Sequence, residues 1–164
     1  METITKAVSA LKDTVRVYQG GRFFFRLTSE ETNGALAIID VRIVPGNEPP
    51  RHYHSREDET NIILTGEITY FIGDDIIKAK AGDIVFMPKG VPHNFKVTSS
   101  TASVRLIVTP GGFENFFAAI THPFNEENEQ LIGAPLSKEK IEMIAKASKE
   151  FGVTFIQHYQ HSQY

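Results

Sequence analysis

The chain of 164 residues contains neither cysteine nor tryptophan, and its charges are nearly balanced. Without cysteine it can form no disulfide, no thiolate metal site and no thiol nucleophile. The 17 lysines and arginines stand against 20 aspartates and glutamates, which argues against nucleic acid or an anionic membrane as a partner. No apolar run approaches the roughly 18 residues of a membrane-spanning helix. The first residues also lack the basic-then-apolar order of a signal peptide, so we expect a cytoplasmic protein.

Short β-rich runs, separated by glycine and proline, fill most of the chain up to Thr109. The sequence has 12 glycines and 8 prolines to supply the turns between them. Many short strands at regular spacing are typical of a sandwich or barrel, so the sequence predicts an all-β fold. The expected strands cover residues 14–18, 22–28, 35–44, 51–54, 59–64, 67–72, 76–79, 83–87, 93–98 and 102–108.

The pattern changes after Thr109, where the strands give way to helices. Residues 113–120 predict a short helix and residues 121–136 predict a loop. Ser137 can cap a second helix that Gly152 ends. The residues expected to share one face of this second helix are Ile141, Ile144, Ala145 and Ser148.

Two histidines, His52 and His54, lie two residues apart in an expected strand. Because residues i and i+2 of a strand point to the same face, their imidazoles can converge on one point. Glu59 follows in an acidic run, where Glu57 shares its strand face and Asp58 opposes it. Imidazoles with one carboxylate suit a divalent transition metal. A solvated acidic turn is the alternative interpretation of this run.

A third histidine, His93, follows a rigid turn made by Pro88, Gly90 and Pro92. Three imidazoles and one carboxylate would leave two positions of an octahedron open, as a catalytic metal site requires and a closed structural site does not. The other histidines lack partners at ligand spacing, and we expect them at the surface: His122, His158 and His161.

These residues resemble the two sequence motifs of the cupin superfamily. The first motif requires a glycine, an HxH pair, a glutamate and a glycine, which are present as Gly46, His52, His54, Glu59 and Gly66. The second requires a glycine, Pro-x-Gly, a histidine and an asparagine, and its first four positions are Gly82, Pro88, Gly90 and His93. Val97 replaces the final asparagine, which is not a ligand position. The glycines are expected where turns need a positive φ or a close backbone approach.

The resemblance implies a jelly-roll β-barrel with a C-terminal helical extension. We expect one domain with three parts: N-terminal strands at 1–34, a core barrel at 35–110 and a helical extension at 111–164. The resemblance also implies one divalent metal per chain (Fe, Mn, Ni, Co, Cu or Zn), held by His52, His54, Glu59 and His93. Cupin-like proteins commonly pair through N-terminal strands, and the edges of residues 14–28 would need covering, so we expect a homodimer.

A second resemblance covers residues 110–117, ProGlyGlyPheGluAsnPhePhe, and the GlyValThrPhe that follows the last helix. It is similar to small bacterial quercetinase-like cupins, which resemble quercetin 2,3-dioxygenases that open a flavonol ring with O₂. This implies a metal-dependent dioxygenase of an aromatic or enol-type small molecule, with O₂ as co-substrate and Glu59 as the catalytic proton acceptor. Two alternatives stay open: a non-catalytic cupin that binds a metal or a small molecule, and a metal-dependent isomerase or hydrolase.

Side chains near the ligands are candidates to line a substrate pocket. Asn61 follows Glu59 by two residues, so it is either a polar substrate contact or a satisfied core amide. Phe116 and its neighbours either form a lid or pack the short helix on the barrel. The remaining pocket candidates, for which core packing is the alternative role, are Ile63, Tyr70, Phe95, Phe113 and Phe117.

Overall fold

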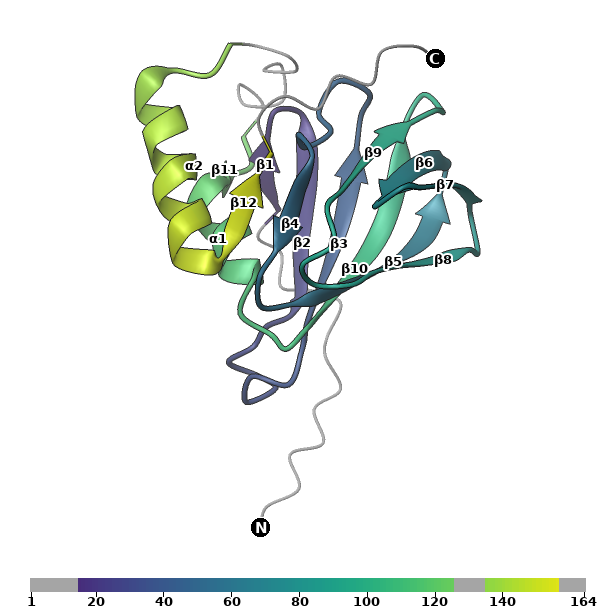
Figure 1. The fold of residues 1–164 in the computed structure, drawn as a ribbon. Helices are drawn as coiled ribbons and strands as arrows, with labels where there is room; N and C mark the ends of the chain where they lie inside the picture. The colour runs from purple at the N-terminus through teal and green to yellow at the C-terminus, as the bar shows by residue number, and fades with distance from the viewer. Residues whose placement is uncertain (1–14, 126–134, 157–164) are drawn as a thin grey trace.

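Two antiparallel sheets face each other in the computed structural model, which describes residues 15–125 and 135–156 (Figure 1). The first sheet has the order β11-β1-β2-β3-β10-β5-β8, and the second has the order β12-β4-β9-β6-β7. The strands are β1 Arg16–Tyr18, β2 Gly21–Leu27, β3 Ala37–Ile43, β4 His52–His54, β5 Asp58–Thr65, β6 Glu67–Ile72, β7 Asp75–Lys80, β8 Ile84–Met87, β9 His93–Val97, β10 Ala102–Thr109, β11 His122–Pro123 and β12 Val153–Phe155. The helices are α1 Glu114–Ile120 and α2 Lys138–Phe151. The predicted all-β fold with a small helical C-terminal part is confirmed.

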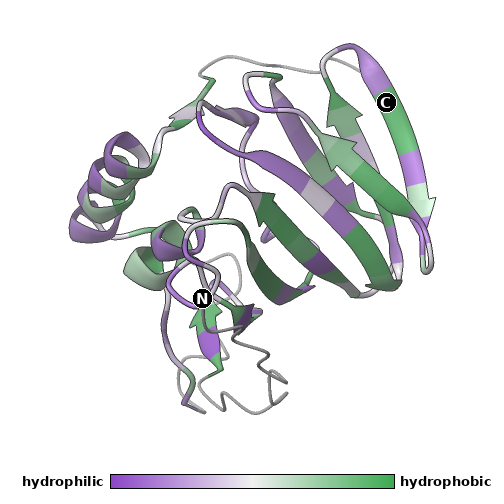
Figure 2. Ribbon diagram, turned by 90° about the horizontal axis from the view of Figure 1, so that it is seen from below, coloured by the Kyte–Doolittle hydropathy of each residue, from purple (hydrophilic) through white to green (hydrophobic). Residues whose placement is uncertain are grey.

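The core lies between the sheets, because alternate residues of each strand point inward. On β10 the buried residues are Ala102, Val104, Leu106 and Val108, which alternate with partly exposed ones. Figure 2 shows hydrophobic stretches on the strands interrupted by hydrophilic ones. The register of β5 on β10 pairs Asn61 with Leu106 and Glu59 with Val108, so both polar residues face the interior.

The turns between strands confirm the expectation for the motif glycines. All four adopt a positive φ, namely Gly46, Gly66, Gly82 and Gly90. At Gly66 space is limiting as well, since a Cβ atom would lie 2.4 Å from the carbonyl oxygen of Thr101. This close approach fixes the turn by which the chain passes from β5 in one sheet to β6 in the other, where only glycine avoids both the strain and the clash.

Helix α2 has the predicted ends and a different buried face. Ser137 accepts a hydrogen bond from the backbone N–H of Lys140, and Gly152 ends the helix with φ 77°. The face expected to be shared by Ile141, Ile144, Ala145 and Ser148 is not the buried face of the helix, because Ile141 is 54% exposed and Ala145 is exposed as well. The buried residues are Ala147 and Ser148, so the helix packs through its C-terminal half.

Two strands, β11 and β12, were not predicted, because two or three residues carry no periodic pattern. Strand β12 pairs antiparallel with β4, placing Val153 opposite His54 and Phe155 opposite His52. Strand β11 covers one edge of β1, whose other edge pairs with β2. His158, His161 and residues 126–134 of the expected loop lie outside the described residues.

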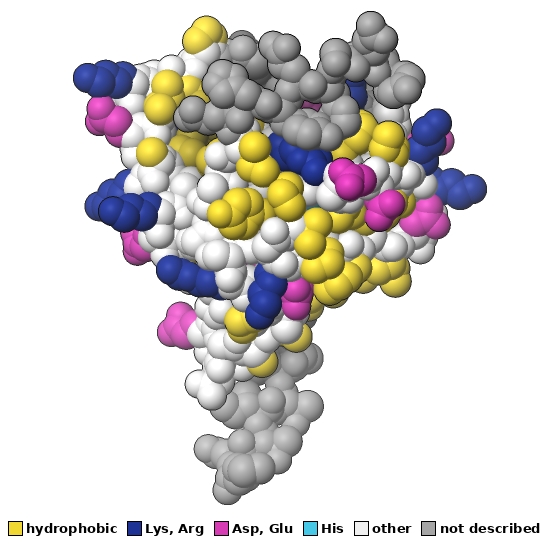
Figure 3. Space-filling model, viewed as in Figure 1, with side chains coloured by type: hydrophobic (Ala, Val, Ile, Leu, Met, Phe, Trp, Pro, Cys, Tyr) yellow, Lys and Arg dark blue, Asp and Glu magenta, His cyan; other side chains and the backbone are white. Residues whose placement is uncertain are grey.

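The N-terminal strands expected to form the homodimer interface are already paired within the chain. Strands β1 and β2 form a continuous run from β11 to β3, so their edges are covered within one chain. Hydrophobic side chains do gather on the face drawn in Figure 3. Large exposed hydrophobic residues on β7 and β8 are Ile76, Ile77, Ile84 and Phe86. Dimer formation stays a prediction. If a dimer forms, the exposed hydrophobic residues of β7 and β8 offer a contact surface that β1 and β2, already paired within the chain, do not.

Neither described helix is long and apolar enough to cross a membrane.

Candidate metal centre

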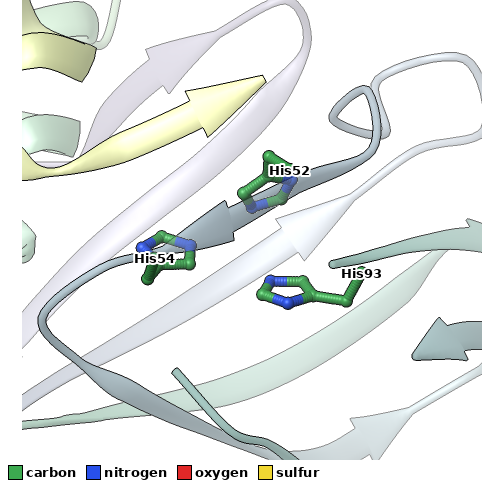
Figure 4. A group of neighbouring side chains, drawn as sticks. All are labelled: His52, His54 and His93. Atoms are coloured by element: carbon green, nitrogen blue, oxygen red, sulfur yellow. The ribbon is translucent and has the colours of Figure 1, made fainter. Parts of the chain in front are cut away.

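Three histidines converge inside the barrel, as Figure 4 shows. His52 and His54 lie on β4, and His93 begins the neighbouring strand β9 directly opposite His52. One ring nitrogen of each residue lies within 4.8 Å of the others. The ring centroids of His52 and His93 are 4.6 Å apart, and those of His54 and His93 are 5.5 Å apart. All three side chains are buried, so this arrangement is part of the interior rather than a surface cluster.

Backbone carbonyls orient two of the three rings. The Nδ1 atom of His52 lies 2.8 Å from the carbonyl oxygen of Pro50, and that of His93 lies 3.0 Å from the carbonyl oxygen of Val91. Because a carbonyl oxygen only accepts, each Nδ1 must carry the hydrogen and donate it. The neutral rings therefore keep the lone pair of Nε2 available, which is the form that binds a metal.

Glu59 reaches this cluster from β5 in the opposite sheet. Its Oε1 atom lies 3.2 Å from Nε2 of His54, and its Oε2 atom lies 3.7 Å from Nε2 of His93. The structure thus brings together all four side chains that the motifs indicated. Three imidazole nitrogens and one carboxylate form a donor set that suits a divalent transition metal better than calcium or magnesium.

Burial sets the protonation of the centre. It raises the pKa of Glu59 to about 8, with a further increase from the nearby charge of Glu57. Burial lowers the pKa of His52 to about 4 and that of His54 further, and the neighbouring imidazoles add to both shifts. Burial also lowers the pKa of His93. At neutral pH the metal-free centre therefore holds a protonated Glu59 carboxyl and neutral imidazole rings. Binding of a cation would release the proton of Glu59.

The unpartnered atoms of the centre fit a metal ion. Among the described residues, Nε2 of His54 and Nε2 of His93 are buried without a hydrogen-bond partner. Buried polar atoms normally have partners, and each exception calls for an explanation. A cation bound to both nitrogens would supply it. His52, His54, Glu59 and His93 are thus the residues that could hold the metal.

A cavity of about 450 Å³ opens beside the centre, with His52, His93 and Glu59 in its wall. Its other walls are mostly apolar and come from the barrel, α1, α2 and β12. A cavity of this size accommodates a small organic molecule. The aromatic residues of its wall include Phe23, Phe95, Phe113, Phe116, Phe117 and Phe155.

The pocket candidates from the sequence divide into two groups. Asn61, Phe95, Phe113 and Phe117 line the cavity. Ile63 is buried and does not line it, so core packing describes its place in this structure. Tyr70 does not line the cavity either. Its hydroxyl accepts a hydrogen bond of 3.1 Å from Nδ2 of Asn61. The Oδ1 atom of Asn61 is buried without a hydrogen-bond partner among the described residues.

The aromatic residues at the N-cap of α1 and within the helix contact both the barrel and the cavity. The ring of Phe113 packs edge-on against His54 at 4.3 Å and against Phe117 at 5.0 Å. Phe116 stacks on Phe113 at 5.2 Å. The helix thus packs on the barrel and closes one side of the cavity at the same time.

Sequence reasoning missed two contributors to the site. Phe155 on β12 lies 5.7 Å from the ring of His52 and belongs to the cavity wall. Glu57 precedes β5 and is only 5% exposed, which excludes the solvated turn considered for it. It lies on the Nδ1 side of His54, whereas Glu59 lies on the Nε2 side.

His122 is exposed, as predicted, and lies next to Lys140.

The raised pKa of Glu59 predicts a pH-dependent stability for the metal-free protein. The unfolded carboxyl ionises near pH 4.5 and the folded one near pH 8, so this stabilisation is complete below pH 4.5 and is lost as the pH rises through 8. The lowered histidine pKa values act in the opposite direction, and only below about pH 6.5. In chelator, the free energy of unfolding should therefore fall by about 2 kcal/mol between pH 6.5 and 8.5.

Urea unfolding at several pH values measures this loss of stability. The matched control is Glu59→Gln, whose side chain does not titrate, so its stability should be nearly constant over the same interval. Parallel curves for the two proteins would show that Glu59 is ionised in the metal-free fold.

Comparison with known proteins gives the centre its family context. The Cupin domain family matches residues 39–110, which include all four residues of the centre. The chain is 25% identical over 95 residues to quercetin 2,3-dioxygenase of Bacillus subtilis, a match covering 58% of this chain and 28% of that protein. It is 30% identical over 86 residues to acireductone dioxygenase of Geobacillus kaustophilus, covering 48% of this chain and 44% of that protein. The matches thus span less than half the length of either relative.

A solved structure shows the same fold. An RmlC-like cupin from Shewanella frigidimarina superimposes with a TM-score of 0.57 at 18% identity, covering 68% of this chain and 96% of that one. This likeness confirms the predicted jelly-roll fold. The identity to the quercetin dioxygenase is too low to place the chain in the quercetinase-like subgroup. The chain thus has the jelly-roll fold of cupins, and its residues 39–110 match the Cupin domain family.

Proposed function

We propose that this protein is a metal-dependent dioxygenase that acts on an aromatic or enol-type small molecule. The observation that carries the proposal is the position of the centre. Three imidazoles converge beside Glu59, and His52, His93 and Glu59 lie in the wall of an apolar cavity of about 450 Å³. A purely structural metal site would be closed by protein ligands on all sides. The similarity to two dioxygenases supports oxygen chemistry over other reactions.

A divalent transition metal at this centre would act as a Lewis acid toward a substrate hydroxyl and would supply redox chemistry toward O₂. Glu59 would accept the proton that the hydroxyl loses. Its carboxylate is the one acidic group among the four residues and lies in the cavity wall, within reach of a substrate hydroxyl bound there. The phenylalanine walls would exclude bulk water and favour a planar apolar substrate.

Asn61 is a polar group of the cavity wall that could orient such a substrate. Its Nδ2 donates to the hydroxyl of Tyr70, which turns Oδ1 away from Tyr70 and leaves it unpartnered among the described residues. We propose that Oδ1 accepts a hydrogen bond from a second hydroxyl of the substrate. The buried acceptor would then disfavour analogues that lack this hydroxyl, because Oδ1 would stay unpaired.

Oxygen uptake tests the proposed function. The protein is loaded in turn with Fe, Mn, Ni, Co, Cu and Zn, and each form is offered flavonols, catechols and β-diketones in an oxygen electrode. We expect about one metal per chain and substrate-dependent oxygen uptake in at least one loaded form, with both atoms of labelled O₂ found in the product. The chelated protein is the control and should consume none.

The oxygen-uptake experiment can also contradict the proposal. A protein that binds one metal per chain and consumes no oxygen with any member of the panel would contradict the dioxygenase proposal. The non-catalytic binding protein and the metal-dependent isomerase or hydrolase would then be the functions to test.

A further inference from the structure

His54 is the one histidine of the centre whose Nδ1 atom has no backbone acceptor. His52 and His93 each place Nδ1 within 3.0 Å of a carbonyl oxygen. The Nδ1 of His54 is buried without a hydrogen-bond partner among the described residues. A neutral ring that presents Nε2 to a metal must carry its hydrogen on Nδ1, and ligating histidines almost always donate that hydrogen to an acceptor. The acceptor for His54 is therefore still to be assigned.

Glu57 supplies the candidate acceptor. Its Oε2 atom lies 4.0 Å from Nδ1 of His54 and is likewise buried without a hydrogen-bond partner. The side chains of His54 and Glu57 are 1% and 6% exposed, so bulk water does not solvate either group. A buried donor and a buried acceptor thus lie about 1 Å too far apart for a hydrogen bond.

The backbone at His54 and Ser55 is held in place. The carbonyl oxygen of His54 accepts a hydrogen bond of 2.7 Å from the N–H of Gly90. The N–H and the hydroxyl of Ser55 both donate to the carbonyl oxygen of Gly152, at 2.9 Å and 3.0 Å. The ring of His54 also packs on Phe113. A small rotation of the Glu57 side chain is therefore the simplest way for the two atoms to meet.

We infer that Glu57 is a positioning residue that accepts a hydrogen bond from Nδ1–H of His54 and so holds Nε2 of that ring toward the metal. The inference rests on the metal centre of the proposed function. Glu57 is not itself a ligand of this centre, since it lies across the imidazole ring from Glu59. A carboxylate in this position also makes the imidazole a stronger donor.

A role in positioning differs from a structural role in its effect on the metal-free protein. A buried carboxylate oxygen without a partner destabilises the fold, because burial removes its hydration. Glu57→Gln removes the buried charge without leaving a cavity, so the thermal stability of the metal-free protein should stay unchanged or rise. Glu114 offers the matched contrast, because this buried carboxylate accepts hydrogen bonds from the N–H groups of Ser29 and Gly112 at 2.6 Å and 2.7 Å.

The experiment compares Glu57→Ala, Glu57→Gln and Glu114→Gln with the unmodified protein, using Co²⁺ as the probe. The readouts are the melting temperature in chelator, the Co²⁺ affinity by competition with a chelator, and the visible spectrum of the Co²⁺ form. For Glu57→Ala we expect a 10–100-fold loss of affinity, the usual effect of removing such a partner, with an altered spectrum. Glu57→Gln keeps an accepting oxygen and should recover most of the affinity. Glu114→Gln should lower the melting temperature and leave affinity and spectrum unchanged.

Unchanged affinity and spectrum in Glu57→Ala and Glu57→Gln, with Co²⁺ bound by the unmodified protein, would overturn this inference alone. A fall in melting temperature of both Glu57 variants, matching that of Glu114→Gln, would assign Glu57 a structural role and overturn it too. Failure of the unmodified protein to bind Co²⁺, Zn²⁺ or Fe²⁺ would instead contradict the metal centre itself, and the proposed function with it.

Discussion

Replacing Glu59 by glutamine should lower turnover by roughly 10²–10⁴-fold while the metal stays bound, the usual range for loss of a general base. Glutamine keeps the size of the side chain and one coordinating oxygen. It removes the negative charge and the only proton acceptor among the four residues of the centre. Since the three imidazoles are unchanged, metal binding should weaken only modestly.

The measurement pairs the oxygen-uptake rate of the loaded variant with its metal content by elemental analysis. Glu67→Gln is the control, because Glu67 is an exposed carboxylate at the start of β6 and should tolerate the change without effect. Full activity in Glu59→Gln with a normal metal content would mean that Glu59 is neither the base nor a necessary charge. The proposed mechanism would then fail even with the metal centre intact.

The four candidate ligands could be named from the sequence because the resemblance to the cupin motifs singles them out, and local signals then orient three of the side chains. Strand alternation places His52 and His54 on one face, and Gly90 permits the turn that delivers His93. Alternation along β5 likewise turns Glu59 inward. Alternation does not show which strands lie opposite one another, so the convergence of β4, β9 and β5 could be predicted only through the motif spacing.

The rest of the site depends on contacts between segments far apart in the chain. The pairing of β12 with β4 joins residues about a hundred positions apart. A strand of three residues is too short to show a sequence pattern that would predict this pairing. The true buried face of α2 follows from the same docking, which leaves Ile141 exposed. Whether Glu57 is solvated or buried depends on what covers the start of β5, and its sequence neighbours do not decide this.

Replacing His52 by alanine should abolish metal binding and activity together, in contrast to Glu59→Gln. Loss of a partner outside the ligand set already costs 10–100-fold in affinity, so loss of one of three imidazole donors should exceed 100-fold. The metal-free variant should stay folded, because His52 lies at the cavity wall, and its nearest aromatic neighbour on β12, Phe155, also borders that cavity.

Competition with a chelator gives the affinity of the His52→Ala variant, and circular dichroism checks its fold. The matched control is His122→Ala, which removes an exposed imidazole beside Lys140 and should change neither quantity. The pair of variants separates two properties of the centre. If His52→Ala loses the metal while Glu59→Gln keeps it and loses turnover, the imidazoles hold the cation and the carboxylate moves the proton. A His52→Ala protein with normal metal content and turnover would mean that the cation binds elsewhere, and the ligand set assigned to β4, β5 and β9 would be wrong.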